Sequence, residues 1–478
     1  MGSTARNFKV RTQSLSIALI LAAAPVLKAH AQIPPPGSGS SRGAANDSAA
    51  EPAGRVPWLT YGIDAGVGET DNVTLAPANK ISQTIATTDV DFVVKGQSRL
   101  LDANATGDFS YLDYLQNAFG SQVIGRFDGQ GKLAIVPERL IWVVQDAFGQ
   151  ASVDPFIPVT PKNVESVNYF STGPTLSMRP GGVNFIDLTA RYARADYETS
   201  PYNSNRGLGS LAVGRQVSAG ASVSLNAEFE RVMFENTVVN TDFDRTSGFG
   251  RYLLHGLRTD FEGDLGATWI KQQGATTTGA LAKVQLDRWL SAAAKLTLTA
   301  GRELTDASLS FSTLQSGVIG PSSIIVTAPA ALTSNNYTSN YASAGWRYQR
   351  NRTIIALSAR WEKDTYSGQP QLDVSHPSAD FSIRRQLTRA FSADLLGRFY
   401  RTDYTNVAIA SNTSSASFDD WLLGGALTWR YGRGLEIRLR YDHNSHVVSA
   451  GGSGYSANQL FLTVGYRPRS APELTEPQ

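Results

Sequence analysis

Hydrophobic and polar residues alternate one by one along most of the chain. Near its end, Leu435, Ile437, Leu439 and Tyr441 fall on one face of an extended strand, while charged residues take the other face. Only a period of two sorts these side chains, so the segment is a strand and not a helix. Comparable segments begin at about twenty places between residues 58 and 457, and they predict an all-β protein.

The links between the predicted strands alternate in length. Residues 446–457 and 404–417 form long links, whereas residues 432–434 and 387–389 form tight ones. Outer-membrane β-barrels have long extracellular loops and short periplasmic turns, and a soluble barrel or propeller has no reason to alternate in this way. We therefore predict an antiparallel transmembrane β-barrel of about 18–20 strands, within a range of roughly 16 to 20, with both termini in the periplasm.

The composition suits such a barrel and excludes other classes. Hydrophobic residues make up 41% of the chain and the mean hydropathy is -0.20. After the N-terminus, no apolar run is long enough for a transmembrane helix. The formal net charge of +2 argues against a nucleic-acid binder. The absence of cysteine excludes disulfides, thiolate metal sites, thiol catalysis and a lipid-modified N-terminal cysteine.

The N-terminus has the features of a secretory signal peptide. A basic stretch precedes an apolar run at residues 15–27, and Ala29-His30-Ala31 fits the rule for cleavage between small residues. The next segment is rich in Pro, Gly, Ser and Ala and carries little to bury. We predict a signal peptide at 1–31, a disordered periplasmic linker at 32–56, an outer-membrane β-barrel at 57–467 and a disordered periplasmic tail at 468–478.

The last predicted strand ends on an aromatic residue. Leu460, Leu462, Val464 and Tyr466 line one face. This arrangement resembles the C-terminal signal that the outer-membrane barrel assembly machinery recognises, although Phe461 stands where that signal usually has glycine. We expect this machinery and the lipid of the outer membrane to be partners of the chain.

Few side chains offer catalytic chemistry. His443, Ser445 and His446 lie together near a predicted extracellular loop. They suggest an acyl hydrolase, a metal pair, or simply a polar strand end followed by a loop. The sequence shows neither an orienting partner nor an oxyanion donor, both of which a serine hydrolase requires. We therefore predict no enzyme, no catalytic residue, no metal and no cofactor.

The charged faces of the strands hold the remaining functional information. A charged side chain facing lipid costs about 2–4 kcal/mol at mid-bilayer, so these faces must look inward. Most of the resulting ion pairs hydrate and stiffen the wall, and together they form a polar pore. The residues predicted to line this pore are Arg191, Glu228, Glu230, Arg302, Arg360, Glu362, Asp394, Arg398, Glu436, Arg438, Arg440 and Asp442.

Several segments resemble a known family. The opening strand from Trp58, with its Asp71-Asn72 loop, is similar to that of outer-membrane proteins associated with exosortase/PEP-CTERM and exopolysaccharide loci. Residues 190–197 and 206–209 resemble the middle strands of the same proteins. The resemblance implies a barrel in the outer membrane through which polysaccharide leaves the cell, working with a periplasmic polysaccharide export protein.

From pattern and resemblance together we expect an outer-membrane pore for exopolysaccharide export. Two alternatives remain open. One is a general or substrate-specific diffusion porin for small solutes, and the other is an outer-membrane lipid or glycan hydrolase that uses His443 and Ser445. The long link at residues 306–339 is either a constriction folded into the lumen or a surface loop, and its near lack of charge suits the constriction.

Overall fold

The computed structural model describes residues 58–154, 156, 159–314, 333–405, 408–409, 412–413, 416–432, 434–448 and 454–468. The predicted signal peptide, the linker and nearly all of the predicted C-terminal tail lie outside these residues. All statements about structure below concern the described part of the chain.

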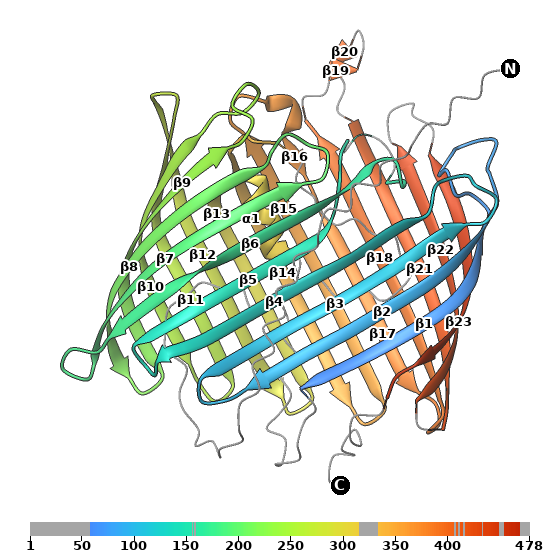
Figure 1. The fold of residues 1–478 in the computed structure, drawn as a ribbon, viewed down its shortest axis with the longest axis horizontal. Coiled ribbons are helices and arrows are strands. Elements are labelled where there is room, and N and C mark those ends of the chain that lie inside the picture. Colours follow the sequence, from blue (N-terminus) through green and yellow to red (C-terminus); the bar gives the residue numbers. More distant parts are fainter. Residues whose placement is uncertain are drawn as a thin grey trace, which may run out of the picture. The chain divides into compact units, whose positions relative to one another are not determined.

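Antiparallel strands form a closed barrel wall (Figure 1). Each long strand pairs with the next one along the chain, and β1 also pairs with β23, which closes the ring. The sheet has 21 strands, of which β16 and β17 occupy one position because both pair with β15 and with β18. The described wall therefore has twenty positions, and the predicted barrel is confirmed.

The first half of the wall consists of long strands that follow one another directly. They are β1 (Leu59–Thr70), β2 (Gln83–Gln97), β3 (Leu101–Tyr114), β4 (Gln122–Val136), β5 (Leu140–Ser152), β6 (Val164–Met178), β7 (Asn184–Tyr197), β8 (Ser204–Ser218), β9 (Ala221–Phe234), β10 (Phe243–His255), β11 (Thr259–Gln272), β12 (Ala275–Ser291) and β13 (Ala294–Thr305).

The second half contains the only helices of the described residues, together with the shortest strands. Its elements are α1 (Ala307–Leu314), β14 (Tyr337–Arg350), β15 (Thr353–Tyr366), the 3-10 helix η1 (Pro370–Leu372), β16 (Val374–Ser375), β17 (Ser378–Gln386), β18 (Phe391–Tyr404), β19 (Ala408–Ile409), β20 (Asn412–Thr413), β21 (Ala416–Tyr431), β22 (Leu435–Val448) and β23 (Tyr455–Tyr466).

The alternation seen in the sequence separates an outer face from an inner face. In β22, Leu439 and Tyr441 are 44% and 48% exposed, whereas Glu436 and Asp442 are 8% and 1% exposed. Apolar side chains elsewhere on the outer face, such as Leu225 and Leu265, are 74% exposed. Apolar surface of this extent is stable only against another apolar phase, which identifies the outer face as the lipid-facing one.

The two ends of the barrel differ in the length of their links. We call the end where β1 finishes the loop end, and the end where β1 begins the turn end. Links at the turn end are short, whereas the loop end carries the long ones, as predicted for extracellular loops. The exception is the two-residue link 273–274, where Gln273 and Gly274 have φ of 50° and 81°. Two positive φ angles in succession are those of a tight type I′ hairpin turn.

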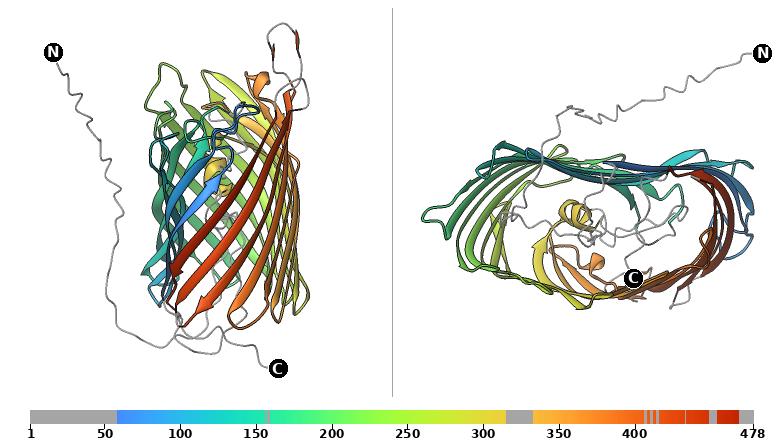
Figure 2. Two further views of the ribbon diagram at one scale, coloured as in Figure 1. Left: turned by 90° about the vertical axis from the view of Figure 1, so that its right-hand side faces the viewer. Right: turned by 90° about the horizontal axis from the view of Figure 1, so that it is seen from below.

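The helix α1 lies inside the ring of strands (Figure 2). It follows β13 at the loop end, and the chain returns to the wall at β14. No helix in the described residues is long and apolar enough to cross a membrane. The predicted inward course of the 306–339 link thus holds for residues 306–314, while residues 315–332 lie outside the described part.

Candidate functional site

The inner face of the wall carries charged side chains that form ion pairs. Eleven of the twelve predicted pore-lining residues lie on this face, as their position in the strand alternation shows. Arg360 is 3.0 Å from Glu362 on the same strand, and Arg440 is 2.6 Å from Asp442. The inward-facing residues are Arg191, Glu228, Glu230, Arg360, Glu362, Asp394, Arg398, Glu436, Arg438, Arg440 and Asp442.

Other inner-face pairs join neighbouring strands. Arg398 of β18 is 2.6 Å from Asp380 of β17, and Arg384 of β17 is 2.5 Å from Asp394 of β18. These pairs place both signs of charge side by side on the wall. A lumen lined in this way holds water and presents hydrogen-bond donors and acceptors to a solute, without a field of one sign.

Arg302 is the exception, and its predicted place in the pore was wrong. Residues that pair across strands share a face, and Arg302 pairs with Ala282, which in turn pairs with the strongly exposed Leu265. Arg302 is therefore on the outer face, where it donates a hydrogen bond to Asn340 (3.0 Å). Its neighbour Glu303 takes the inner position and pairs with Lys283 (2.6 Å), because adjacent residues of a strand cannot share a face.

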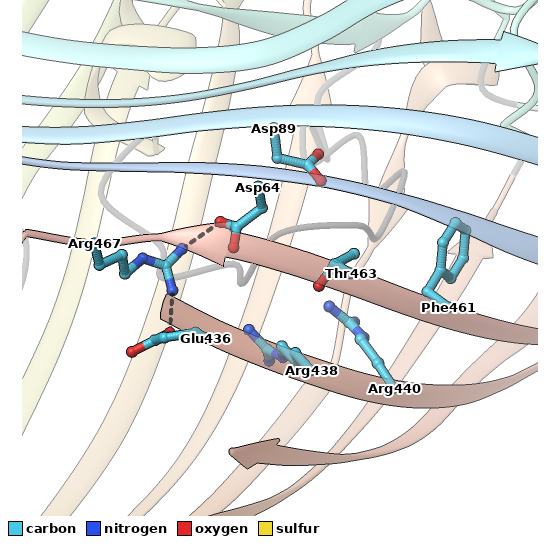
Figure 3. Close-up of a pocket in the computed structure, with 8 residues that line it drawn as sticks. All are labelled: Asp64, Asp89, Glu436, Arg438, Arg440, Phe461, Thr463 and Arg467. Carbon is cyan, nitrogen blue, oxygen red and sulfur yellow. Dashed lines mark hydrogen bonds and ion pairs between the residues drawn. The ribbon is translucent and has the colours of Figure 1, made fainter. Parts of the chain in front are cut away.

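A small pocket opens on the inner wall where the barrel closes (Figure 3). Arg467, directly after β23, is 2.8 Å from Asp64 of β1 and 3.0 Å from Glu436 of β22, and it also pairs with Asp91 of β2. One guanidinium therefore joins three other strands at the seam. Thr463, Phe461, Asp89, Arg438 and Arg440 complete the lining.

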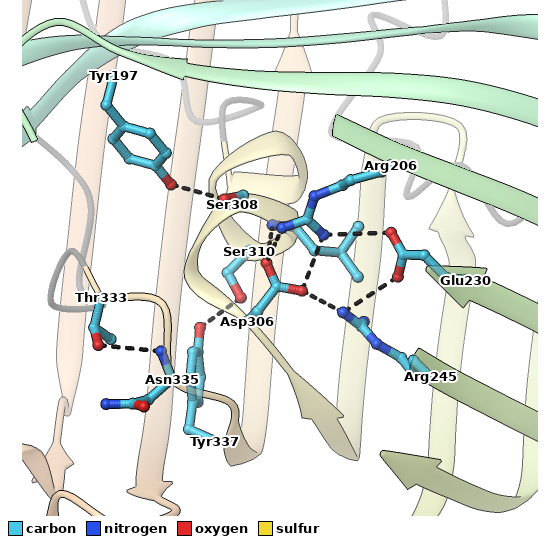
Figure 4. Close-up of polar contacts among 11 residues, drawn as sticks. Tyr197, Arg206, Glu230, Arg245, Asp306, Ser308, Ser310, Thr333, Asn335 and Tyr337 are labelled. Atoms are coloured by element: carbon cyan, nitrogen blue, oxygen red, sulfur yellow. Dashed lines mark hydrogen bonds and ion pairs between the residues drawn. The ribbon is translucent and has the colours of Figure 1, made fainter. Parts of the chain in front are cut away.

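A second cluster fixes α1 inside the lumen (Figure 4). Asp306, directly before α1, accepts hydrogen bonds from Arg206 of β8 (2.6 Å and 3.1 Å) and from Arg245 of β10. Glu230 of β9 lies 3.3 Å from each of the two arginines. All four side chains are at least 90% buried. Two cations and two anions thus balance within one buried group, which we call the Asp306 cluster.

Neutral contacts complete the attachment of α1. The Leu309 N–H donates to Asp306 Oδ1 (3.3 Å), so Asp306 also caps the helix N-terminus. Ser308 and Ser310 hydrogen-bond the hydroxyls of Tyr197 (2.8 Å) and Tyr337 (2.5 Å), which lie on β7 and β14. Phe311 packs in a buried group with residues of β5, β6 and β7. The helix therefore joins wall segments that are several strands apart in the ring.

The charge of Asp306 depends on its two arginines. Burial alone would raise the pKa of Asp306, but the positive charges of Arg206 and Arg245 and the hydrogen bond from Arg206 hold that pKa well below its ordinary value of 3.8. A carboxyl group with a lowered folded pKa stabilises the fold above its unfolded pKa and loses this contribution as the pH falls through the folded value.

We accordingly expect the attachment of α1 to persist on acidification from neutral pH to pH 3.8 and to weaken only below it. Single-channel conductance recorded in steps across this range checks the expectation. An Asp306→Asn variant is the control, because it should show no conductance change of its own at the acid end. An increase in wild-type conductance that is complete at mildly acidic pH would contradict the assignment.

Sequence reasoning missed the central members of both clusters. Strand alternation places Arg206 and Arg245 on inner faces, yet it says nothing of a common partner, because Asp306 follows Arg206 by 100 residues. The predicted constriction at 306–339 was therefore found from loop length and composition, and not from the charges that hold it. Arg467 was only the last residue of the predicted barrel segment, 57–467, and the sequence assigned no role to it.

The predicted hydrolase residues lie on the outer face near the loop end. His443 Nδ1 is 2.8 Å from Asn458 Oδ1, an orienting partner that the sequence did not identify. In the described residues, however, no hydrogen bond joins His443 to Ser445, so the contact between base and nucleophile is missing. No group of three His, Asp or Glu side chains suited to a metal ion occurs in the described residues either.

A closed barrel with an apolar outer face and a charged lumen defines an outer-membrane β-barrel protein. No family model matches the chain, and no curated protein matches it. Membership of the exosortase/PEP-CTERM-associated family stays a prediction.

Solved structures with a similar fold have little sequence in common with the chain. The FrpB iron transporter from Neisseria meningitidis is 8% identical with a TM-score of 0.41, over 86% of this chain and 81% of that one. A mutant of the ferric enterobactin receptor PfeA from Pseudomonas aeruginosa, in complex with enterobactin, is 10% identical with a TM-score of 0.44, over 85% and 81%. The copper transporter OprC is 11% identical with a TM-score of 0.39, over 87% and 81%.

These comparisons correct the expected function. The structures named above are described as transporters or receptors for iron, enterobactin and copper, and they are not described as exporters of polysaccharide. The prediction of exopolysaccharide export is thus contradicted. The periplasmic polysaccharide export partner was expected only on that ground, so the expectation loses its support. At this level of identity the likeness concerns the fold, so the substrates of those proteins are not transferred to this chain.

Proposed function

We propose that the protein is an outer-membrane transport barrel for small polar solutes, with a lumen narrowed by α1. The observation that carries the proposal is the Asp306 cluster, which fixes a helix inside a charged barrel. Polar side chains that line a lumen replace part of a solute's hydration, and a segment lying across it limits the size of what passes.

The inner wall agrees with a small polar solute. Its charges are mostly paired, as in Arg398–Asp380 and Arg384–Asp394, so the wall offers hydrogen bonds to solutes of either sign. The fixed helix occupies part of the lumen beside the wall segments that it joins (Figure 2). A long flexible polymer is disfavoured by the same feature.

Reconstitution of the purified barrel into planar bilayers and into liposomes tests the proposal. We expect stepwise ion conductance, with liposome swelling in small sugars and amino acids that declines as the solute grows. Protein-free bilayers and heat-denatured barrel are the controls. A folded barrel that conducts no ions, or one that lets large dextrans and small sugars pass at equal rates, would refute it.

A further inference from the structure

A repeated arrangement of outer-face residues marks the loop end of the barrel. On five strands that run toward the loop end, an aromatic residue is followed two positions later by Lys or Arg. We call the five cations the basic belt. The pairs are Tyr192 and Arg194 on β7, Phe229 and Arg231 on β9, Trp269 and Lys271 on β11, Trp361 and Lys363 on β15, and Phe399 and Arg401 on β18.

Both members of each pair lie on the outer face. Residues two apart in a strand share a face, and the residue between them is on the inner face. On β9, for instance, Phe229 is 48% exposed, whereas the intervening Glu230 is 6% exposed and belongs to the Asp306 cluster. Each cation is thus about 6.6 Å farther along its tilted strand, toward the loop end, than its aromatic neighbour.

The aromatic members give the depth of the belt in the membrane. Tyr and Trp concentrate at the boundary between the hydrocarbon and the headgroups, where an amphipathic ring is best accommodated. Trp361 and Trp269 are 45% and 41% exposed on the outer face. Because the cations lie one step beyond these rings, they are level with the headgroups of the extracellular leaflet.

The cations of the belt are neutralised to different degrees. Arg401 pairs with Asp403 (3.0 Å) and lies 3.8 Å from Asp419. Arg194 pairs with Asp196 (2.7 Å) and Glu235 (2.9 Å). Arg231 is 60% exposed and its nearest carboxylate, on Asp244, is 3.9 Å away. Within the described part of the chain, Lys363 has no ion pair.

One cation outside the five of the belt, Arg302, adds to the unpaired charge. Lys271 also has no ion pair in the described residues. Arg302 of β13 donates to the neutral Asn340, which lies in register between Arg302 and Lys363. Lys271, Arg302 and Lys363, on β11, β13 and β15, therefore carry positive charge that no carboxylate pairs with in the described residues.

We propose that the basic belt binds the phosphate groups of a multiply phosphorylated lipid in the extracellular leaflet. Arg302 and Lys363 lie in register on either side of Asn340, and Arg231 and Lys271 lie in register on either side of Asp244. Two strand spacings, about 9.6 Å, separate the two cations in each case. A lipid with two or more phosphates can contact neighbouring cations at once, which a lipid with one phosphate cannot do. Exposed arginine and lysine side chains at this depth are suited to phosphate oxygens.

Two matched variants of the purified barrel test this proposal. The belt variant carries Arg231→Gln, Lys271→Gln, Arg302→Gln and Lys363→Gln. The control variant removes the same number of cations at the turn end, where Arg350, Arg352 and Arg385 line a shallow pocket and Arg215 lies on a different part of the wall, near the turn end of β8. Both variants lose the same net charge, so a general electrostatic effect would be equal in the two.

The probe is bis-phosphorylated lipid A, compared with its dephosphorylated form and with phosphatidylglycerol in the same detergent. We expect wild-type barrel to prefer the bis-phosphorylated lipid. A cation near an anionic lipid surface contributes about fivefold to binding, so the belt variant should bind at least about tenfold more weakly. The control variant should bind as the wild type does.

Three results would overturn the proposal: unchanged binding by the belt variant, an equal loss in the control, or equal binding of phosphatidylglycerol. Migration of the unheated protein on a gel shows whether each variant is folded. If the belt variant does not fold, the single Lys363→Gln change serves, because Lys363 is exposed. It should weaken binding about fivefold, and Lys363→Arg should restore it.

Discussion

Replacing Asp306 by asparagine is expected to raise the single-channel conductance of the barrel and to lower its free energy of unfolding. The change leaves Arg206 and Arg245 buried with only Glu230 to balance them. Removing one partner of a buried ion pair costs about 3–5 kcal/mol, because an uncompensated charge remains. Conductance in planar bilayers and urea unfolding in detergent measure the two effects.

An Asp380→Asn variant is the matched control for this prediction. Asp380 also pairs with an inner-face arginine, Arg398, but it is 40% exposed and has no contact with α1 among the described residues. It should lose stability only slightly and keep the wild-type conductance. A double variant with Asp306→Asn and Arg245→Gln restores the charge balance and should regain stability while staying open. Equal conductance in wild type and Asp306→Asn would show that the cluster does not hold the constriction.

Replacing Arg467 by alanine is expected to weaken the closure of the barrel. The seam pairs residues 63–70 of β1 with residues 459–466 of β23, and Arg467 extends it toward the turn end through Asp64, Asp91 and Glu436. Without the guanidinium, three carboxylates remain close together. Because Arg467 is 31% exposed, water screens part of the loss, and we expect about 1–3 kcal/mol. Urea unfolding of the purified barrel gives the value.

Arg430→Ala provides the comparison for the seam. Arg430 of β21 pairs with the same carboxylate, that of Glu436 (2.8 Å), but on the side away from the seam. Its loss removes one cation from the inner wall without touching the contact between the first and last strands. If the two variants unfold at the same denaturant concentration, Arg467 at the seam contributes no more to the stability of the barrel than Arg430 does.

Local sequence pattern was sufficient for the strands and for the face that each side chain takes. Alternation at residues 435–442 predicted that Leu439 faces lipid and that Arg440 faces the lumen, and both positions are found. The period of two is imposed by the backbone of each strand, so it is readable without knowledge of neighbours. Arg302 shows the limit: it was assigned inward, although alternation allows only one of Arg302 and Glu303 on the inner face, and Glu303 is the one found there.

The contacts that these side chains make with other strands could not be predicted from the local pattern. Which inner-face groups meet depends on the register between strands and on the path of the long link after β13, and neither is encoded within one strand. Arg206 and Arg245 were therefore not singled out from the sequence, because their common partner Asp306 lies far along the chain in the link after β13. The unpaired cations of the basic belt were hidden for the same reason, since their height depends on where each strand ends.

The Asp306 cluster has a consequence for the order of assembly. Its arginines are 100 and 61 residues earlier in the chain than the carboxylate that they bind. Contacts of such sequence separation form late, because a long segment must be ordered before they are made. The constriction therefore forms only after β8, β9, β10 and β13 have been assembled into the barrel wall. Before that step α1 is not fixed in the lumen, and the lumen is not narrowed.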